Sequence, residues 1–183
     1  MGGVTGIMGL FRTDRNWAAF YCRLAIAIIF IPHGMDKLVK YAPFGWEGPQ
    51  AWAETCSRLL NYSFIPVAYR PVLAQISAWV EVVAAVSCIL GLLVRLCIIP
   101  LIVNMVVAIA AVQWRNGFWI NHTLNGVPAP GFEYQIIIIV ICLAILASGA
   151  GSLSIDKLVG GEPDYYAEEE YEYDYDYEGD PRR

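Results

Sequence analysis

Apolar and polar positions form long blocks along the chain, with four apolar stretches separated by shorter segments rich in polar residues, glycine and proline. The stretches cover about residues 17–39, 71–93, 96–115 and 134–152. Each has close to the ~20 residues that an α-helix needs to cross a hydrocarbon core of roughly 30 Å. The pattern therefore predicts an all-α polytopic membrane protein, built as a four-helix transmembrane bundle.

The segment between the first two stretches, residues 40–70, is too polar to cross a membrane and is rich in tryptophan and proline. Within it, apolar residues recur at helical spacing opposite two charged residues: Trp52, Cys56, Leu59 and Leu60 against Glu54 and Arg58. This amphipathic pattern predicts a short helix lying in the membrane interface between helices 1 and 2. We expect it to cap the bundle.

The composition supports a membrane protein, because 57% of the residues are hydrophobic and only 16% are charged. The chain has no glycine-rich phosphate loop, no H-E-x-x-H, no G-x-S-x-G and no nucleic-acid-binding motif. Its five cysteines are scattered without a C-x-x-C pair and are interpreted as small buried hydrophobic residues. A self-contained soluble active site, a nucleic-acid partner and a metal site are therefore not expected.

The charge is distributed unevenly. The last 22 residues contain ten acidic residues and two arginines, a charge of −8, so the remainder of the chain carries +3 of the total −5. High charge with no aliphatic residue beyond Ala167 is typical of a disordered segment. We therefore divide the chain into a transmembrane domain, residues 1–158, and a disordered acidic Tyr-rich tail, residues 159–183.

The first apolar stretch is long enough to span the membrane and is not followed by a small-residue cleavage site, so we expect it to remain as a signal anchor. Arg12 and Arg15 precede it, and positive residues before a first helix favour the cytoplasmic side. The prediction is a multi-pass membrane protein with both termini cytoplasmic.

Two ionisable residues, Arg23 and Glu81, lie well inside predicted membrane helices. A charge at mid-membrane costs at least ~2.5 to 3.5 kcal/mol, so such residues face the bundle interior and a partner. Two interpretations remain open at this point. In the first, the two residues only hold the first two helices in register: either Arg23 and Glu81 form a buried ion pair, or Arg23 reaches the near interface and Glu81 stays uncharged. In the second, Glu81 joins His33, Asp36 and Lys37 in a polar pocket at the far end of the first helix.

In the pocket interpretation, His33 and Glu81 are the candidate catalytic residues, because an intramembrane acid and a histidine are the usual groups for proton transfer. The candidate binding residues are Arg23, Asp36, Lys37, Asn104, Asn116 and Trp119. Asn104 is a polar residue inside the third stretch. Asn116 and Trp119 follow that stretch. Asn116, with Arg115 and Asn121, would help to hold an anionic headgroup, whereas an aromatic belt at the membrane interface fully explains the ring of Trp119.

His33 and His122 are the only histidines. A bis-histidine haem is disfavoured, because His122 lies in a loop and no C-x-x-C-H sequence is present. Among cofactors, a quinone remains the candidate.

Several short motifs follow one another at the ends of the apolar stretches. The first stretch opens with Arg23-Leu24 and closes with Phe30 to Gly34 and Lys37-Leu38, and the second contains Glu81, with Ile89 to Leu92 and Arg95 after it. Asn116 to Phe118 follow the third stretch, and the fourth opens with Glu133-Tyr134 and closes with Ser152 to Asp156. Over about residues 20–158 this order and spacing resemble the DoxX-like family of small four-helix membrane proteins. The resemblance implies a four-helix bundle in a bacterial or archaeal cytoplasmic membrane. Members of the family include the membrane subunit of thiosulfate:quinone oxidoreductase.

These observations lead to two hypotheses for the function. The first is a membrane subunit of a quinone-linked oxidoreductase system, with a polar intramembrane pocket for a quinone or a small anionic substrate. The alternative is a non-catalytic membrane anchor or assembly subunit that docks a partner protein through its acidic Tyr-rich tail. In both we expect the lipid bilayer and either a protein partner or further copies of the chain as neighbours. A transporter is disfavoured, because the helices are few and none form paired broken segments.

Overall fold

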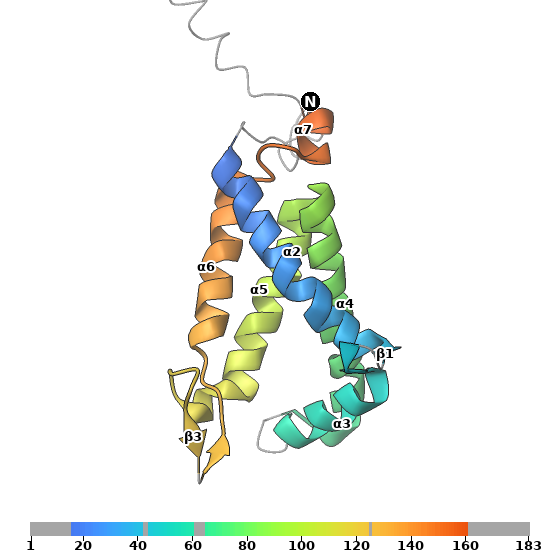
Figure 1. Ribbon diagram of the computed structural model, residues 1–183, viewed down its shortest axis with the longest axis vertical. Helices are drawn as coiled ribbons and strands as arrows, with labels where there is room; N and C mark the ends of the chain where they lie inside the picture. Colours follow the sequence, from blue (N-terminus) through green and yellow to red (C-terminus); the bar gives the residue numbers. More distant parts are fainter. Residues whose placement is uncertain (1–15, 42–43, 61–64, 125, 161–183) are drawn as a thin grey trace, which may run out of the picture.

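Four long helices form an elongated bundle (Figure 1). The computed structural model describes residues 16–41, 44–60, 65–124 and 126–160. The helices are α2 (Trp17–Leu38), α4 (Arg70–Leu90), α5 (Val94–Ala111) and α6 (Glu133–Ser148). Helix α2 packs against α4 and α6, and α5 packs against the same two neighbours, so the four helices close into a ring. The predicted all-α bundle is confirmed.

The helices are apolar both inside and outside the bundle. Ile26, Phe30, Ile98 and Ile138 are at most 1% exposed and form part of the core. Large apolar side chains also cover the outer surface, among them Ile28, Trp79, Val103 and Val140, each more than half exposed. In water such a surface would be unstable, but in a bilayer it faces lipid. This two-sided distribution is that of a membrane-spanning bundle.

The four helices differ in length. Trp17–Leu38, Val67–Leu90 and Val94–Ala111 are long and apolar enough to cross a membrane. Helix α6 is equally apolar but has 16 residues, about 24 Å at 1.5 Å per residue, and is the shortest of the four.

The end of the bundle where α2 begins is closed by α7 (Ile155–Gly160) (Figure 1). Helix α4 ends at Gly91, which has a φ of +63° and stops the helix. The Asp156 carboxylate accepts hydrogen bonds from the backbone N–H groups of Leu93 (2.7 Å) and Val94 (3.2 Å). Asp156 therefore satisfies backbone donors at the start of α5 that would otherwise be buried and unpaired.

At the opposite end, the short helix α3 (Pro49–Leu59) lies against α4. It is joined to α2 by a small hairpin of β1 (Lys40–Tyr41) and β2 (Trp46–Glu47), and to α4 by the 3₁₀ turn η3 (Val67–Tyr69). The predicted helix between helices 1 and 2 is thus confirmed. Its apolar face includes Cys56, which is 8% exposed.

The chain between α5 and α6 runs through the 3₁₀ turn η4 (Gln113–Asn116) and a second hairpin of β3 (Thr123–Leu124) and β4 (Val127–Pro128). Neither hairpin is predicted from the sequence, because strands of two residues are too short to show a two-residue period. The predicted acidic tail lies outside the described residues from residue 161 onward. The division into two domains therefore stays a prediction.

Candidate functional site

A buried ion pair joins the end of α2 to the middle of α4. Lys37 Nζ lies 2.5 Å from Glu81 Oε1 and 2.6 Å from Oε2. The Lys37 side chain is 15% exposed and that of Glu81 is 4% exposed. Burying either charge alone would be strongly unfavourable, so the two side chains compensate one another.

The close approach of α2 and α4 explains why these two residues meet. Gly34 lies one turn before Lys37, and a Cβ added there would be 2.5 Å from Val82 Cγ2 and 3.4 Å from the Ala78 carbonyl oxygen. Only glycine leaves room for this contact. It aligns the last turn of α2 with the middle of α4, and Lys37 is the cation within reach of Glu81.

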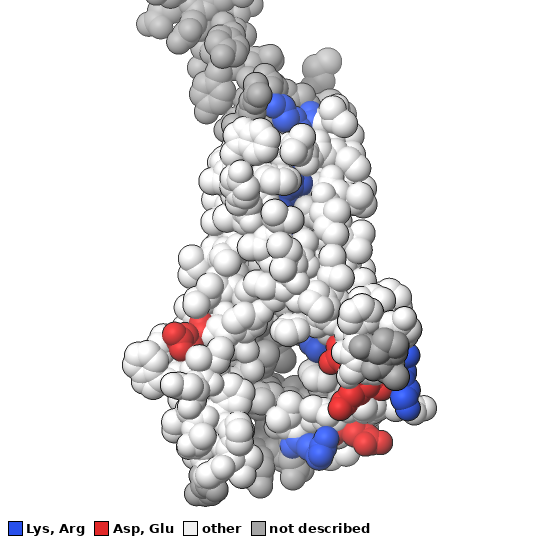
Figure 2. Space-filling model, in the orientation of Figure 1, with Lys and Arg blue, Asp and Glu red and all other residues white. Residues whose placement is uncertain are grey.

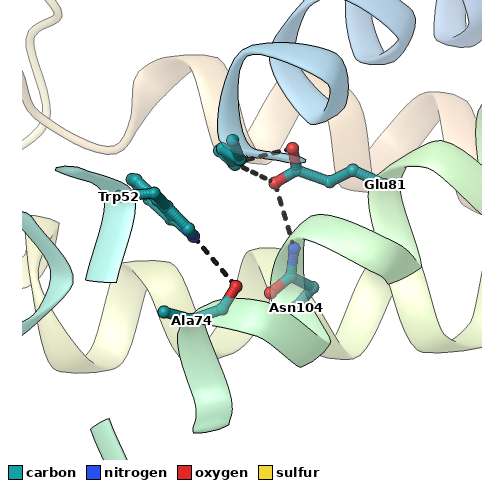
Figure 3. A network of polar contacts seen from close by, with 5 residues as sticks. Trp52, Ala74, Glu81 and Asn104 are labelled. Atoms are coloured by element: carbon teal, nitrogen blue, oxygen red, sulfur yellow. Dashed lines mark hydrogen bonds and ion pairs between the residues drawn. The ribbon is translucent and has the colours of Figure 1, made fainter. Parts of the chain in front are cut away.

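Two further elements complete the polar cluster. Asn104 on α5 donates from Nδ2 to Glu81 Oε1 at 3.3 Å, as Figure 3 shows. Lys37 Nζ lies 4.4 Å from the centroid of the Trp52 ring on α3, a favourable cation–π distance. Trp52 is held in turn by a 2.9 Å hydrogen bond from its Nε1 to the Ala74 carbonyl oxygen (Figure 3). Helices α2, α3, α4 and α5 therefore each contribute one side chain to the cluster.

The cluster forms part of the wall of a cavity of about 710 Å³. Most of the wall consists of apolar side chains of α3, α4 and α5. Some of them also lie on the outer surfaces of α4 and α5, where Ile76, Ile99 and Val103 are between 49% and 56% exposed. Figure 2 shows the molecule hollowed in its lower half, between α3 and the β3–β4 hairpin, with a basic and an acidic group side by side at the edge. The cavity is thus apolar, with its charges confined to one region, and its walls extend to the lipid-facing surface.

The predicted site residues near this end are placed as follows. Glu81, Lys37 and Asn104 touch one another, and His33 lines the same cavity. The His33 ring packs edge-on against Phe30 at 6.4 Å between centroids, and the residue is exposed at the margin of the bundle. The structure therefore brings four of the eight predicted site residues to one cavity.

Asp36 has a different position. Its Oδ1 accepts a hydrogen bond from the Glu47 N–H at 3.0 Å, and its backbone carbonyl accepts one from the Gly48 N–H at 2.9 Å. These bonds attach the β1–β2 hairpin to the end of α2. Asp36 does not line the cavity, although it lies next to Lys37 in the chain.

Arg23 lies at the other end of the bundle, and the predicted alternative of an Arg23–Glu81 ion pair is wrong. The guanidinium is 1% exposed, and its Nη2 donates to the carbonyl oxygens of Ser152 (2.8 Å) and Leu153 (2.9 Å). The physical reason is the register set at Gly34, which places Glu81 beside Lys37, about 21 Å along α2 from Arg23. Arg23 instead ties α2 to the segment that follows α6.

Asn116 and Trp119 also lie away from the cavity lining. Asn116 donates from Nδ2 to the Pro130 carbonyl oxygen at 2.9 Å, which ties together the two ends of the loop between α5 and α6. Trp119 is 64% exposed and packs edge-on against Phe118. In these positions the asparagine supports the loop, and the tryptophan is available to the membrane interface.

Several cavity residues with polar or aromatic side chains are not among the sequence-based candidates, including Trp52, Gln113, Tyr134 and Gln135. The signal for the two glutamines was present, since each is an amide at the margin of an apolar stretch. Trp52 is predicted only as part of an amphipathic face. Its position beside Lys37 depends on how α3 folds back onto α4, and a local sequence pattern cannot predict that packing.

Cys56 on α3 lines the cavity near the ion pair. Burial raises the pKa of its thiol to about 11, an effect partly offset by the nearby Lys37 charge and reinforced by Glu81. At neutral pH the residue is therefore a protonated thiol and not a nucleophilic thiolate. Among the residues that the structure describes, no group of three His, Cys, Asp or Glu side chains is placed to hold a metal ion.

A bundle of helices that are apolar on both their inner and outer faces defines an integral, polytopic membrane protein. A family model described as DoxX matches residues 18–114, more than half of the chain, and the chain belongs to the DoxX family. The match runs from the start of α2 into η4 and so includes Lys37, Glu81 and Asn104. No curated protein and no solved structure matches the chain.

Proposed function

We propose that this protein is the membrane subunit of a quinone-linked oxidoreductase system, and that its cavity binds the quinone. The observation that carries the proposal is a cavity of about 710 Å³ that is mostly apolar, with a buried Lys37–Glu81 pair in its wall. Small-molecule sites of this size are typically apolar with a few well-placed polar groups. A quinone matches that description, because its ring and tail are apolar and its two carbonyl oxygens are polar.

The lining supports access from the bilayer. Ile76, Ile99 and Val103 belong to the cavity wall and are also exposed on the outer faces of α4 and α5. A lipid-soluble molecule can therefore reach the cavity from the hydrocarbon without first entering water. This route suits a quinone, which resides in the membrane.

The polar cluster supplies groups suited to quinone reduction, in which a quinone takes up two electrons and two protons to form a quinol. Glu81 accepts from two of the three N–H donors of the Lys37 ammonium, which leaves a third for a quinone carbonyl. Such a charge-assisted bond would stabilise negative charge developing on that oxygen. Glu81 and His33 are the proposed proton-transfer residues, with His33 at the exposed margin of the cavity. The electrons would come from a redox partner subunit.

A small anionic substrate is supported less well by the same geometry. The charge of Lys37 is already compensated by Glu81, and most of the surrounding wall is apolar. An anion would have to be desolvated without gaining an unpaired cation.

We further propose that the protein resides in the cytoplasmic membrane of a prokaryote with both termini in the cytoplasm. Helix α2 then begins at the cytoplasmic face, and Lys37, at its end, lies toward the opposite face. The cavity would accordingly draw quinone from the outer leaflet.

The proposal is tested by measuring quinone in the purified protein and quinone reduction in host membranes. We expect gently extracted protein to retain quinone, and Glu81→Gln to lower quinone reduction at least tenfold with the protein still present in the membrane. Glu54→Gln is the matched control, because Glu54 lies on the exposed face of α3 and outside the cavity lining. Absence of bound quinone together with unchanged reduction in the Glu81→Gln membranes would refute the proposal.

A further inference from the structure

Helices α4 and α5 form a long apolar groove that makes up one side of the cavity. On α5 the lining residues recur at successive turns of one helix face, from Ile99 and Val103 to Val112. At 1.5 Å per residue this face is about 20 Å long. The two helices pack against each other, and the lining of α4 runs from Leu73 to Glu81. The cavity is therefore elongated along these two helices.

The groove opens sideways, toward the surface that faces lipid. Val103 is 56% exposed, and Val106, one turn further on the same face of α5, is 50% exposed although it does not line the cavity. On α4, Ile76 lines the cavity and Trp79, one turn further, does not, and both are more than half exposed. The exposed faces of the two helices thus continue past the cavity, so the rim of the groove belongs to the outer surface of the bundle. In a bilayer this rim contacts hydrocarbon.

The polar cluster lies beside this opening. Asn104 on α5 donates to Glu81 on α4 at 3.3 Å, so these two residues mark one level of the bundle. Their chain neighbours Val103 and Val80 line the groove at the same level. A ring held by the Lys37 ammonium, which contacts Glu81, is therefore bound at a level where the groove is open.

The shape and chemistry of the groove suit a long apolar chain. The cavity of about 710 Å³ is within the range of pockets that enclose drug-sized molecules, and a long isoprenoid chain exceeds that size. The bilayer interior is as apolar as a leucine side chain, so a chain gains no hydrophobic free energy by leaving it. A site for a long-chain molecule must therefore bind the polar head and leave the chain an apolar path to the lipid. The groove provides this path, because apolar side chains line it as far as the outer surface, among them Ile76, Ile99 and Val103.

We propose that the groove between α4 and α5 binds the isoprenoid chain of a long-chain quinone, which leaves the site sideways past Ile76, Ile99 and Val103 while its ring stays at Lys37. The inference rests on the proposed function, since it assumes that the cavity takes a quinone. It adds the class of quinone and the residues that bind its chain. The acyl chain of a phospholipid has the same apolar chemistry, so the experiment has to distinguish the two occupants.

The first experiment locates the chain. A quinone with a photoreactive diazirine on its isoprenoid chain is incorporated into lipid nanodiscs that contain the full-length protein, and labelled residues are identified by mass spectrometry after irradiation. We expect at least tenfold more labelling of Ile76, Ile99 and Val103 than of Ile28 and Val140, which are more than half exposed on α2 and α6 and lie outside the cavity lining. An excess of unlabelled long-chain quinone should remove the labelling of the groove. Equal labelling of all these faces, unchanged by the competitor, would place the chain in bulk lipid and overturn the inference.

A phospholipid with the same diazirine on one acyl chain separates the two occupants. If the groove belongs to the quinone, an excess of unlabelled long-chain quinone should displace any phospholipid label from it. Labelling of the groove by the phospholipid that persists in excess quinone would identify a lipid site and overturn the assignment to quinone.

The second experiment closes the groove. Val103→Trp places a bulky side chain at the opening, and Val106→Trp is the matched control on the same exposed face outside the lining. We expect Val103→Trp to lower the affinity for the long-chain quinone at least tenfold more than the affinity for the same headgroup without a chain, and Val106→Trp to change neither. Ile99→Trp, with Leu96→Trp as its control, repeats the test one turn away and covers a failure of Val103→Trp to fold.

The binding outcomes separate the inference from the function on which it rests. Equal losses of both affinities in Val103→Trp would assign the residue to the ring site and overturn the inference, while the proposed quinone site would stand. Unchanged affinities in both Val103→Trp and Ile99→Trp would show that the chain takes another route and would also overturn it. Failure of the wild type to bind either the headgroup or the long-chain quinone would remove the inference together with the proposed function.

Discussion

Gly34 on α2 lies against Val82 on α4 so closely that a Cβ added at Gly34 would be 2.5 Å from Val82 Cγ2. The next turn of α2 carries Lys37, and the residue before Val82 is Glu81, so this backbone contact brings the two charges together. The ion pair in the cavity wall therefore depends on a glycine that has no chemical role of its own.

We expect Gly34→Ala to lower the stability of the bundle by roughly 1–3 kcal/mol, because the added methyl group forces α2 and α4 apart or displaces Val82. Thermal unfolding of the protein in detergent measures the effect. Ala18→Val is the control, since Ala18 lies on the exposed face of the same helix. If both variants melt together with the wild type, the helices are not held in contact at Gly34.

Breaking the ion pair from one side should be more damaging than replacing both partners. Lys37→Met leaves the Glu81 carboxylate buried without its cation, and we expect a loss of about 3–5 kcal/mol. The double variant Lys37→Met with Glu81→Met removes both charges and should recover most of that stability. Urea or thermal unfolding of the wild type, the single variants and the double variant measures the coupling between the residues. Additive effects would contradict a buried pair.

The raised pKa of Cys56, about 11, predicts slow alkylation of its thiol. In a variant that keeps Cys56 and replaces the other four cysteines by alanine, reaction with iodoacetamide should remain slow at pH 8 and accelerate as the pH approaches 11. Because the folded-state pKa is above the ordinary value of 9.0, deprotonation favours the unfolded chain. The contribution of Cys56 to stability is therefore complete below about pH 9 and declines as the pH rises toward 11. Rapid alkylation of the folded protein at pH 8 would contradict this assignment; protein unfolded in detergent is the positive control.

Asp156 should matter for the fold and not for the cavity. It accepts two backbone hydrogen bonds at the start of α5, is 1% exposed, and lies at the end of the bundle away from Lys37. We expect Asp156→Ala to lower stability by at least ~1–2 kcal/mol, the usual loss for a helix cap, and Asp156→Asn to lower it less because one acceptor oxygen remains. Thermal unfolding and quinone titration of the same samples separate the two effects. An altered quinone affinity in a folded Asp156→Asn protein would contradict the separation of the two ends.

Much of the architecture is predicted by local pattern. The lengths of the apolar stretches indicate the four long helices, and the spacing of Trp52 and Cys56 indicates α3. These features depend on residues close together in the chain. The sequence could also predict that polar residues gather inside the bundle, because an ionisable residue in an apolar helix must turn inward. Four such predicted residues do line one cavity: Glu81, Lys37, Asn104 and His33.

The partners of those residues were not predictable in the same way. From the sequence, Glu81 has two possible sets of partners, Arg23 or the residues at the end of α2, and only the contact at Gly34 decides in favour of Lys37. Gln113 and Gln135 belong to different helical segments and share a wall only because α5 and α6 are neighbours in the bundle.

By itself, then, the sequence determined that this is a membrane bundle, approximately where its helices lie and which residues are too polar to face lipid. The tertiary structure decided that Glu81 pairs with Lys37 and that Arg23 binds backbone carbonyl groups at the other end of the bundle. It also decided which amide residues line the cavity. The physical reason is that hydrophobicity and helix length act within one segment, whereas the register between helices is set by close packing of side chains far apart in the chain.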